Sequence, residues 1–259
     1  MKTIQRTFSV IVIFLFIFSV VFAQEYKHAV NQAEKLVIKD LFGELLVEGH
    51  TGNEIIISVS GVSKPPERAD GLKPIYSSGA EDNTGLGIAV EENNNVIEIL
   101  RASRRLEEGH IKILVPANLA IQIEYNSVHS DDVTVRNLSN EIKVISEHAD
   151  LEFENITGPA KIYSTHGSID VIFNEINQES PISITSPHGD IDVTFPAQAA
   201  ADLELYAGYG EIFSNLDIEY EKGKNGMRSY GNRITGKIGG GGVKITIKSD
   251  HADIYLREK

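Results

Sequence analysis

Apolar and polar residues alternate in short runs along most of the chain. Clear examples are "IDVIF" at 169–173, "ISIT" at 182–185 and "IDVTF" at 191–195. A period of two is typical of β-strands that bury one face. No segment after the first 23 residues sustains the 3.6-residue period of an amphipathic helix. The pattern therefore predicts an all-β protein.

A short phrase recurs between these strands and sets a longer period. It consists of serine, a variable residue, an aromatic ring and a small residue, as in "STHG" at 164–167 and "SPHG" at 186–189. Seven copies, 18 to 22 residues apart, place the rings at His129, His148, His166, His188, Tyr209, Tyr230 and His251. Two strands and two corners per period describe a β-solenoid, whose successive turns stack roughly 4.8 Å apart. We expect a single-stranded, β-helix-like solenoid of about six turns at 127–259, with these rings stacked in one column.

The small residues of the phrase indicate tight corners. Gly, Ala or Ser follows every ring, and serine stands two positions before the ring in five of the seven copies. Because Ala or Ser replaces Gly at some corners, small size is expected to matter more than a positive φ angle. The isoleucines at 142, 162 and 182 and Leu203 recur at the same period and are expected in the core.

The section at 24–126 is rich in strands but lacks the repeat. Three strands are expected in 35–61 and three more in 86–125, with a hairpin turn at "EENNNV". Between them, 63–85 holds three prolines and three glycines, which predicts a long loop. We expect this section and the solenoid to form one continuous domain over 24–259.

The first 23 residues have the pattern of a signal peptide. A basic start, "MKTIQR", precedes the uncharged run "TFSVIVIFLFIFSVVFA". An uncleaved membrane anchor is the alternative, and after cleavage no integral membrane span is expected. The chain has no cysteine, so it cannot be a lipoprotein attached through a thioether. Export to the periplasm, the cell surface or the medium is predicted.

The charge of the chain excludes some partners. The formal net charge is −13, and the basic residues are scattered rather than gathered in a stripe. Nucleic acid is therefore not an expected partner, and direct docking on anionic lipid is disfavoured. A surface glycan or an envelope protein remains as the expected partner, and the oligomeric state is left open.

Several segments resemble a known family. The run from "KILVPANLAIQIEYNSVHS" to "IYSTHGSIDV" and the closing "GKIGGGGVKITIKSDHADIYL" carry a "VP" before the first repeat, "NLSN" and "NITG" breaks and a glycine run. Over residues 35–256 the chain resembles the bacterial putative-adhesin family, related to the auto-transporter adhesin head domain. The resemblance implies a secreted or cell-envelope β-solenoid without a demonstrated biochemical activity. It does not explain the histidines at so many corners.

Two columns of side chains are candidate metal sites. Histidines on consecutive turns, with His148, His166 and His188 as the best triplet, could share zinc or copper, whereas structural stacking is the competing interpretation. The outward acids form the second candidate: Asp150, Asp190 and Asp253, with Glu152, Asp170 and Asp192 two positions on. Calcium would relieve the repulsion among stacked carboxylates, and the alternative is a solvated acidic face.

Catalysis is not expected from these residues. The trio Ser164, His166 and Asp170 suggests a hydrolase, but Ser186, His188 and Asp192 repeat it almost unchanged, and catalysis rarely needs copies. No singular acidic cluster interrupts the repeat as a polysaccharide lyase or hydrolase would require. We therefore expect a non-catalytic, adhesin-like exported protein that binds or scaffolds through repeated β-faces. A carbohydrate-active β-helix enzyme and a divalent-cation-dependent scaffold are the alternatives.

Overall fold

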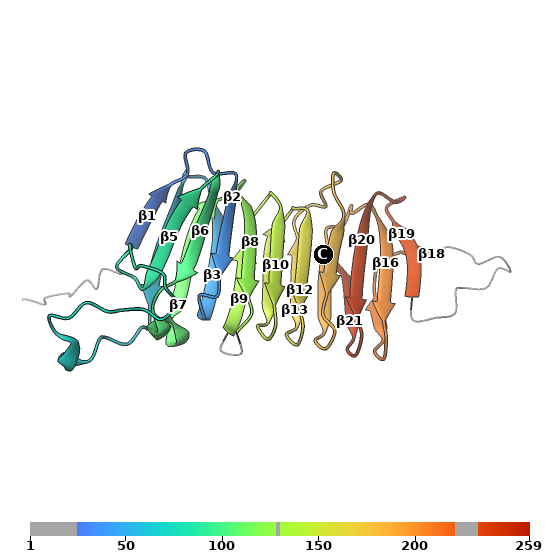
Figure 1. Cartoon of the computed structure of the whole chain (residues 1–259). Helices are drawn as coiled ribbons and strands as arrows, with labels where there is room; N and C mark the ends of the chain where they lie inside the picture. Colours follow the sequence, from blue (N-terminus) through green and yellow to red (C-terminus); the bar gives the residue numbers. More distant parts are fainter. Residues whose placement is uncertain (1–24, 128–129, 221–232) are drawn as a thin grey trace, which may run out of the picture.

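The computed structural model describes residues 25–127, 130–220 and 233–259. The expected signal peptide, His129 and Tyr230 lie outside these residues. The described chain forms an elongated stack of strands in two sheets that face each other (Figure 1). It contains no α-helix in these ranges, only two 3-10 turns, η1 (Glu67–Ala69) and η2 (Arg104–Glu108). The predicted all-β solenoid is therefore confirmed.

The first sheet, sheet A, has ten strands. In spatial order they are β1 (Glu25–Ala29), β4 (Glu54–Ser60), β7 (His110–Pro116), β3 (Gly43–His50), β9 (Ser130–Arg136), β11 (Leu151–Ile156), β13 (Ile169–Phe173), β15 (Ile191–Phe195), β21 (Ile254–Glu258) and β17 (Ile212–Ser214). From β7 to β17 all neighbouring strands are parallel, because each rung of the coil runs in the same direction as the next.

The second sheet, sheet B, has eleven strands. In spatial order they are β18 (Glu219–Tyr220), β19 (Arg233–Ile238), β16 (Ala201–Ala207), β20 (Val243–Ser249), β14 (Ile182–Thr185), β12 (Ala160–Ser164), β10 (Ile142–Ser146), β8 (Ala120–Tyr125), β2 (Lys35–Lys39), β6 (Val96–Arg101) and β5 (Ile88–Asn93). One strand of sheet B, a corner and the following strand of sheet A make one rung, as in β10–β11.

The core lies between the sheets and follows from the alternation. Inward residues of neighbouring rungs pair in register, so that Val144 lies beside Ile162 and Ile162 beside Ile184, and all three are buried. On sheet A, Phe173 and Phe195 stack with ring centroids 6.0 Å apart. The expected row of isoleucines is shifted: Ile142 pairs with Ala160 instead of Ile162, because the corners before these strands differ in length.

The order of the rungs differs from their order in the sequence at both ends. The last rung, β20–β21, lies between β14–β15 and β16–β17, where the dark red strands separate the orange ones (Figure 1). In the same way, β2–β3 lies between β6–β7 and β8–β9. At each end, two rungs that are consecutive in the chain are thus separated in space by a rung from a distant segment.

The N-terminal section contains all the predicted strands and two more, of which β1 at 25–29 is the first. The three strands of 35–61 are confirmed as β2, β3 and β4, whereas 86–125 holds four strands instead of three. The predicted hairpin joins β5 and β6, and its Asn94 and Asn95 adopt the left-handed region, with φ of 50° and 63°. Residues 61–87 form no strand, as the prolines and glycines predict. The glycine run at 239–242 forms a tight turn, in which Gly239, Gly240 and Gly241 have positive φ.

Candidate functional site

The corner serines at 146, 164, 186 and 249 are fully buried, and two of them, Ser164 and Ser186, bind the backbone of two rungs. The Oγ of Ser186 accepts a hydrogen bond from the Gly189 N–H at 2.9 Å and donates one to the Gly167 carbonyl of the preceding rung at 2.8 Å. Ser164 makes the same pair of bonds with Gly167 and Ala149. A buried hydroxyl is stable only when such partners satisfy it. Serine therefore recurs because it ties each corner to its neighbour, a role that the sequence analysis attributed to small size alone.

The small residue after each ring is required by close backbone contact. A Cβ on Gly189 would lie 2.2 Å from the Gly167 carbonyl oxygen, and one on Gly167 would lie 2.0 Å from the Ala149 oxygen. Neither glycine has a positive φ. The expectation that size rather than φ selects these residues is confirmed.

The aromatic rings form the expected column along the corners. Ring centroids are 5.1 Å apart for His148 and His166, 5.0 Å for His166 and His188, and 4.8 Å for His188 and His251. Tyr209 follows, 5.1 Å from His251. Tyr209 follows His188 in the sequence of corner rings but does not stack on it, because the inserted rung β20–β21 places His251 between them. Tyr209, 85% exposed, lies at the C-terminal end of the column among the described residues.

The stacked geometry bears on the proposed metal ligands His148, His166 and His188. Their rings are nearly parallel, with interplanar angles of 29° and 12°, and the side chains are exposed. Nitrogen lone pairs lie in the ring planes, so stacked rings direct them side by side rather than toward one point. Within the described ranges, no group of three or more His, Asp or Glu side chains is arranged to hold a metal ion.

The aspartates two positions after the rings, Asp150, Asp190 and Asp253, form the first acid column, and they join neighbouring rungs. Asp150 accepts the Ser168 N–H at 2.7 Å, and Asp190 accepts the Asp253 N–H at 3.0 Å. Asp253 in turn accepts the Glu211 N–H at 2.8 Å. An aspartate two positions after the ring thus pairs with an amide of the next rung, which explains its recurrence without a cation.

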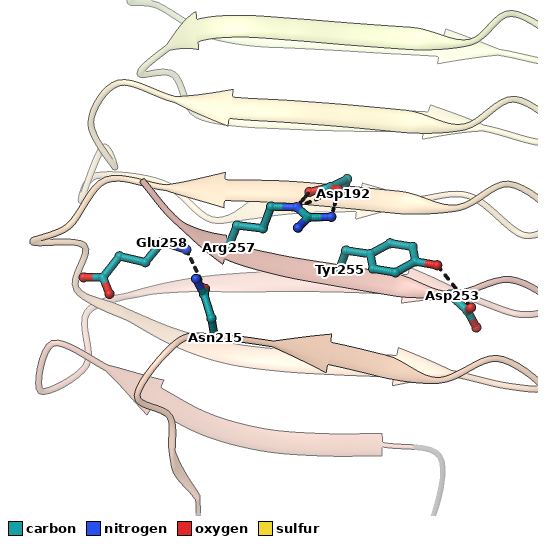
Figure 2. A network of polar contacts seen from close by, with 6 residues as sticks. All are labelled: Asp192, Asn215, Asp253, Tyr255, Arg257 and Glu258. Atoms are coloured by element: carbon teal, nitrogen blue, oxygen red, sulfur yellow. Dashed lines mark hydrogen bonds and ion pairs between the residues drawn. The ribbon is translucent and has the colours of Figure 1, made fainter.

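The second acid column lies two residues further along the strands of sheet A. Glu152, Asp170 and Asp192 are direct neighbours in register. Although the Asp170 side chain is exposed, partial burial between the flanking rungs raises its pKa, and the charges of Asp192 and Asp150 raise it further. Figure 2 shows that Arg257 relieves one end of this column: its guanidinium binds both oxygens of Asp192, at 2.7 to 2.9 Å.

The acid column gives way to aromatic rings at the C-terminal end. In register with Asp192 lie Tyr255 and then Phe213, whose rings stack with centroids 5.5 Å apart. The Tyr255 hydroxyl donates to the Asp253 carboxylate at 3.3 Å (Figure 2). We call Tyr209, His251, Phe213 and Tyr255, with the carboxylates of Glu211 and Asp253 between the two ring pairs, the aromatic end of sheet A. The sequence analysis missed it, because Phe213 and Tyr255 become neighbours only through the inserted rung.

The apparent hydrolase trio lacks the geometry of a nucleophile and its base. Ser164 is buried, and its hydroxyl is engaged by the backbone of Ala149 and Gly167. The His166 ring stacks on its neighbours and makes no hydrogen bond with Ser164 in the described part of the chain. A serine nucleophile needs an accessible hydroxyl bonded to its base. The repeated trio is therefore part of the corner.

Comparison with solved structures gives matches to two adhesin-type proteins, named as such in their descriptions. A putative cell adhesion protein from Clostridium sporogenes is 14% identical, with a TM-score of 0.43, and the alignment covers 92% of this chain and all of that one. A putative adhesin from Bacteroides fragilis is also 14% identical, with a TM-score of 0.37, over 90% of this chain and 95% of that one. Among proteins of curated function, none matches this sequence.

The family match rests on the solenoid rungs themselves. Among the residues described, no helix is long and apolar enough to cross a membrane. The model of the Toastrack DUF4097 family matches residues 110–257, which include β7 to β21 and every corner described above. This match is shorter than the 35–256 over which the sequence suggested a family resemblance. It nevertheless spans more than half of the chain, and the chain therefore belongs to the Toastrack DUF4097 family.

Proposed function

We propose that this protein is a non-catalytic, adhesin-like protein of the cell envelope or surface, and that it binds glycan through the aromatic end of sheet A. The observation that carries the proposal is the pair of ring stacks, Tyr209 on His251 and Phe213 on Tyr255, whose outer rings, Tyr209 and Phe213, are exposed. Aromatic faces pack against the apolar faces of sugar rings, and carboxylates accept hydrogen bonds from sugar hydroxyls.

The spacing of the two ring stacks suits an extended ligand. Tyr209 in the corner and Phe213 on β17 are four residues apart, which at about 3.3 Å per residue separates them by roughly 13 Å at most. In the sequence, Glu211 lies between them and Asp253 lies between His251 and Tyr255. A flat polymer could contact both stacks and the acids at once, whereas a single small molecule would contact one.

A binding role also agrees with what the repeated residues do. The corner serines and the aspartates of the first acid column are engaged in hydrogen bonds between rungs, so they are unavailable as nucleophiles or bases. Catalysis needs a group free to change its bonding during the reaction. Export, which the apolar segment at 1–23 predicts, would place the acidic faces outside the cytoplasm, where surface glycans and envelope proteins are the available partners.

A glycan array followed by titration tests this proposal. The protein should bind at least one class of glycan, and Phe213→Ala and Tyr209→Ala should each weaken binding by about tenfold, the value of one aromatic contact. Tyr163→Ala is the matched control, because Tyr163 lies on the outer side of β12 in the opposite sheet. Absence of binding to any glycan, or turnover of a bound polysaccharide, would refute the proposal.

A further inference from the structure

A pocket lies at the N-terminal end of the stack, far from the aromatic end of sheet A. It has a volume of about 550 Å³ and opens between the long loop after β4 and the end of the β-sheets. Its lining joins Val59 and Val62, the loop residues Leu72 and Leu86, and Leu106 of η2. Small-molecule sites in proteins have volumes of about 300 to 1,000 Å³ and mostly apolar walls. The pocket has both properties.

The loop itself does not fill this space. Ile75 is 99% exposed and lies outside the lining, and Leu72, which lines the pocket, is still 70% exposed, so neither side chain closes it. The loop is instead held by polar contacts. Ser78 donates to the Ala102 carbonyl at 3.1 Å, and Asn83 exchanges two hydrogen bonds with the backbone of Val90. The loop is thus fixed above the pocket and leaves it open.

The polar groups at the pocket define the charge of its ligand. Lys73 and Arg105 both line it, and neither side chain forms an ion pair or hydrogen bond with any described residue. The hydroxyl of Tyr76 is likewise without a hydrogen-bond partner in these ranges. Two cations without acidic partners in the lining of an apolar pocket favour an anionic ligand over a neutral or cationic one.

The one carboxylate among the lining residues, Asp82, forms no ion pair with Lys73 or Arg105. Asp82 accepts hydrogen bonds from the N–H groups of Thr84, Gly85 and Gly87 at 2.8 to 3.1 Å. Its oxygens are therefore engaged by the loop backbone. Burial and the Asp82 charge raise the pKa of Tyr76, so its hydroxyl remains a neutral donor at physiological pH.

We infer that this pocket binds one acyl chain and the anionic head group of an amphiphile, with the acyl chain against Val62, Leu86 and Leu106 and the head group on Arg105, Lys73 and the Tyr76 hydroxyl. Hydrogen bonds from a guanidinium to a carboxylate or phosphate are among the strongest in proteins, so Arg105 is the main determinant of the head group. Such a ligand could be a free fatty acid or a lipid within a bilayer, and the two sources share this chemistry. The inference is independent of the glycan site, which lies at the opposite end.

Calorimetric titration of the full protein, purified without detergent, tests the inference with matched ligands. Dodecanoate, kept below its micellar concentration, should bind with a stoichiometry of one. Dodecanol has the same tail without the charge, and butyrate has the same head with a short tail, and both should bind at least about tenfold more weakly. Equal binding of dodecanol or of butyrate would overturn the inference.

Vesicles of phosphatidylglycerol distinguish the two sources of the ligand, a free fatty acid and a bilayer lipid. If the vesicles compete with dodecanoate for one site, the pocket also accepts the bilayer lipid. If dodecanoate binds and the vesicles do not compete, the ligand is the free acid. Binding to vesicles alone would overturn the pocket assignment.

Variants locate the site. Arg105→Gln should weaken dodecanoate binding about tenfold, whereas Arg104→Gln, one residue away, exposed and outside the pocket lining, should leave it unchanged. Ala69→Trp places a large ring in the lining and should abolish binding. Melting curves identify any variant that fails to fold. If Ala69→Trp fails to fold, the comparison of Arg105→Gln with Arg104→Gln still tests the site. Equal affinities for these two arginine variants would refute the assignment.

Discussion

The hydrogen bonds of Ser186 allow a quantitative test of the corner. Ser186→Ala deletes one oxygen and changes the packing volume very little. It leaves two buried backbone groups without that oxygen: the Gly189 N–H, 2.9 Å from it, and the Gly167 carbonyl, 2.8 Å from it. Ser186 itself is completely buried, and both glycines are buried as well, so water cannot replace the lost bonds.

The expected loss follows from the number of bonds broken. Leaving a buried donor or acceptor unpaired costs about 1 to 3 kcal/mol, so Ser186→Ala should lower the free energy of unfolding by about 3 kcal/mol. Ser249 makes one such bond among the described residues, to the Ala252 N–H, and Ser249→Ala should cost about half as much. Ser183→Ala, on the outer side of β14, is the matched control and should change stability by less than about 0.5 kcal/mol.

Urea unfolding followed by circular dichroism measures these differences. The midpoints should shift in the order Ser186→Ala, Ser249→Ala, Ser183→Ala, with an unchanged dependence of the free energy on urea concentration. If Ser186→Ala unfolds at the same midpoint as Ser183→Ala, the serine hydroxyl does not join the rungs energetically. Equal shifts for Ser186→Ala and Ser249→Ala would show that the number of bonds does not determine the cost.

Three further outcomes follow from the columns and corners. Gly189→Ala should lower stability by about 2 kcal/mol or more, because its Cβ would lie 2.2 Å from the Gly167 carbonyl oxygen, and an unchanged urea midpoint would contradict this contact. The pKa of Asp170 lies above its usual value of 3.8, so its ionisation opposes folding as the pH rises through the folded-state pKa. Asp170→Asn should therefore stabilise the protein at pH 7 by a fraction of 1 kcal/mol and have no effect at pH 3, where both states are protonated; a loss of stability at pH 7 would show that this carboxylate is needed. Removal of divalent cations with EDTA should leave the melting temperature unchanged, and a lower melting temperature that calcium or zinc restores would assign a metal to the acid or histidine columns.

The sequence was sufficient to predict the corner but not the role of every atom in it. Serine, the aromatic ring and the small residue recur at a fixed period, and period and alternation together imply stacked rungs. The pairing of the Ser164 hydroxyl with a carbonyl of the preceding rung depends on a distance of 3.1 Å between segments 15 residues apart. A repeated pattern shows that neighbours are equivalent, but it does not show which of their atoms meet.

The spatial order of the last rungs could not be predicted from the sequence for a related reason. His188, Tyr209 and His251 all stand in the same phrase, and 21 residues separate each copy from the next in this part of the chain. Any order of such equivalent rungs buries similar apolar surface, so the pattern cannot distinguish them. The structure inserts β20–β21 before β16–β17, and Tyr255 thereby meets Phe213.

The inserted rung also explains where specific chemistry can arise in a repetitive fold. In the middle of the stack each corner is bonded to equivalent corners on both sides. Its serine and aspartate are therefore hydrogen-bonded to a neighbouring rung, and both faces of its ring are stacked on other rings. A binding group has to be free on at least one side, and this condition is met where the repeat stops. At the C-terminal end of the stack, Tyr209 and Phe213 are accessible. At the N-terminal end, Lys73 and Arg105 lie beside an open apolar pocket. Substitutions within the central columns should therefore change stability before they change binding, and substitutions at the two ends should do the reverse.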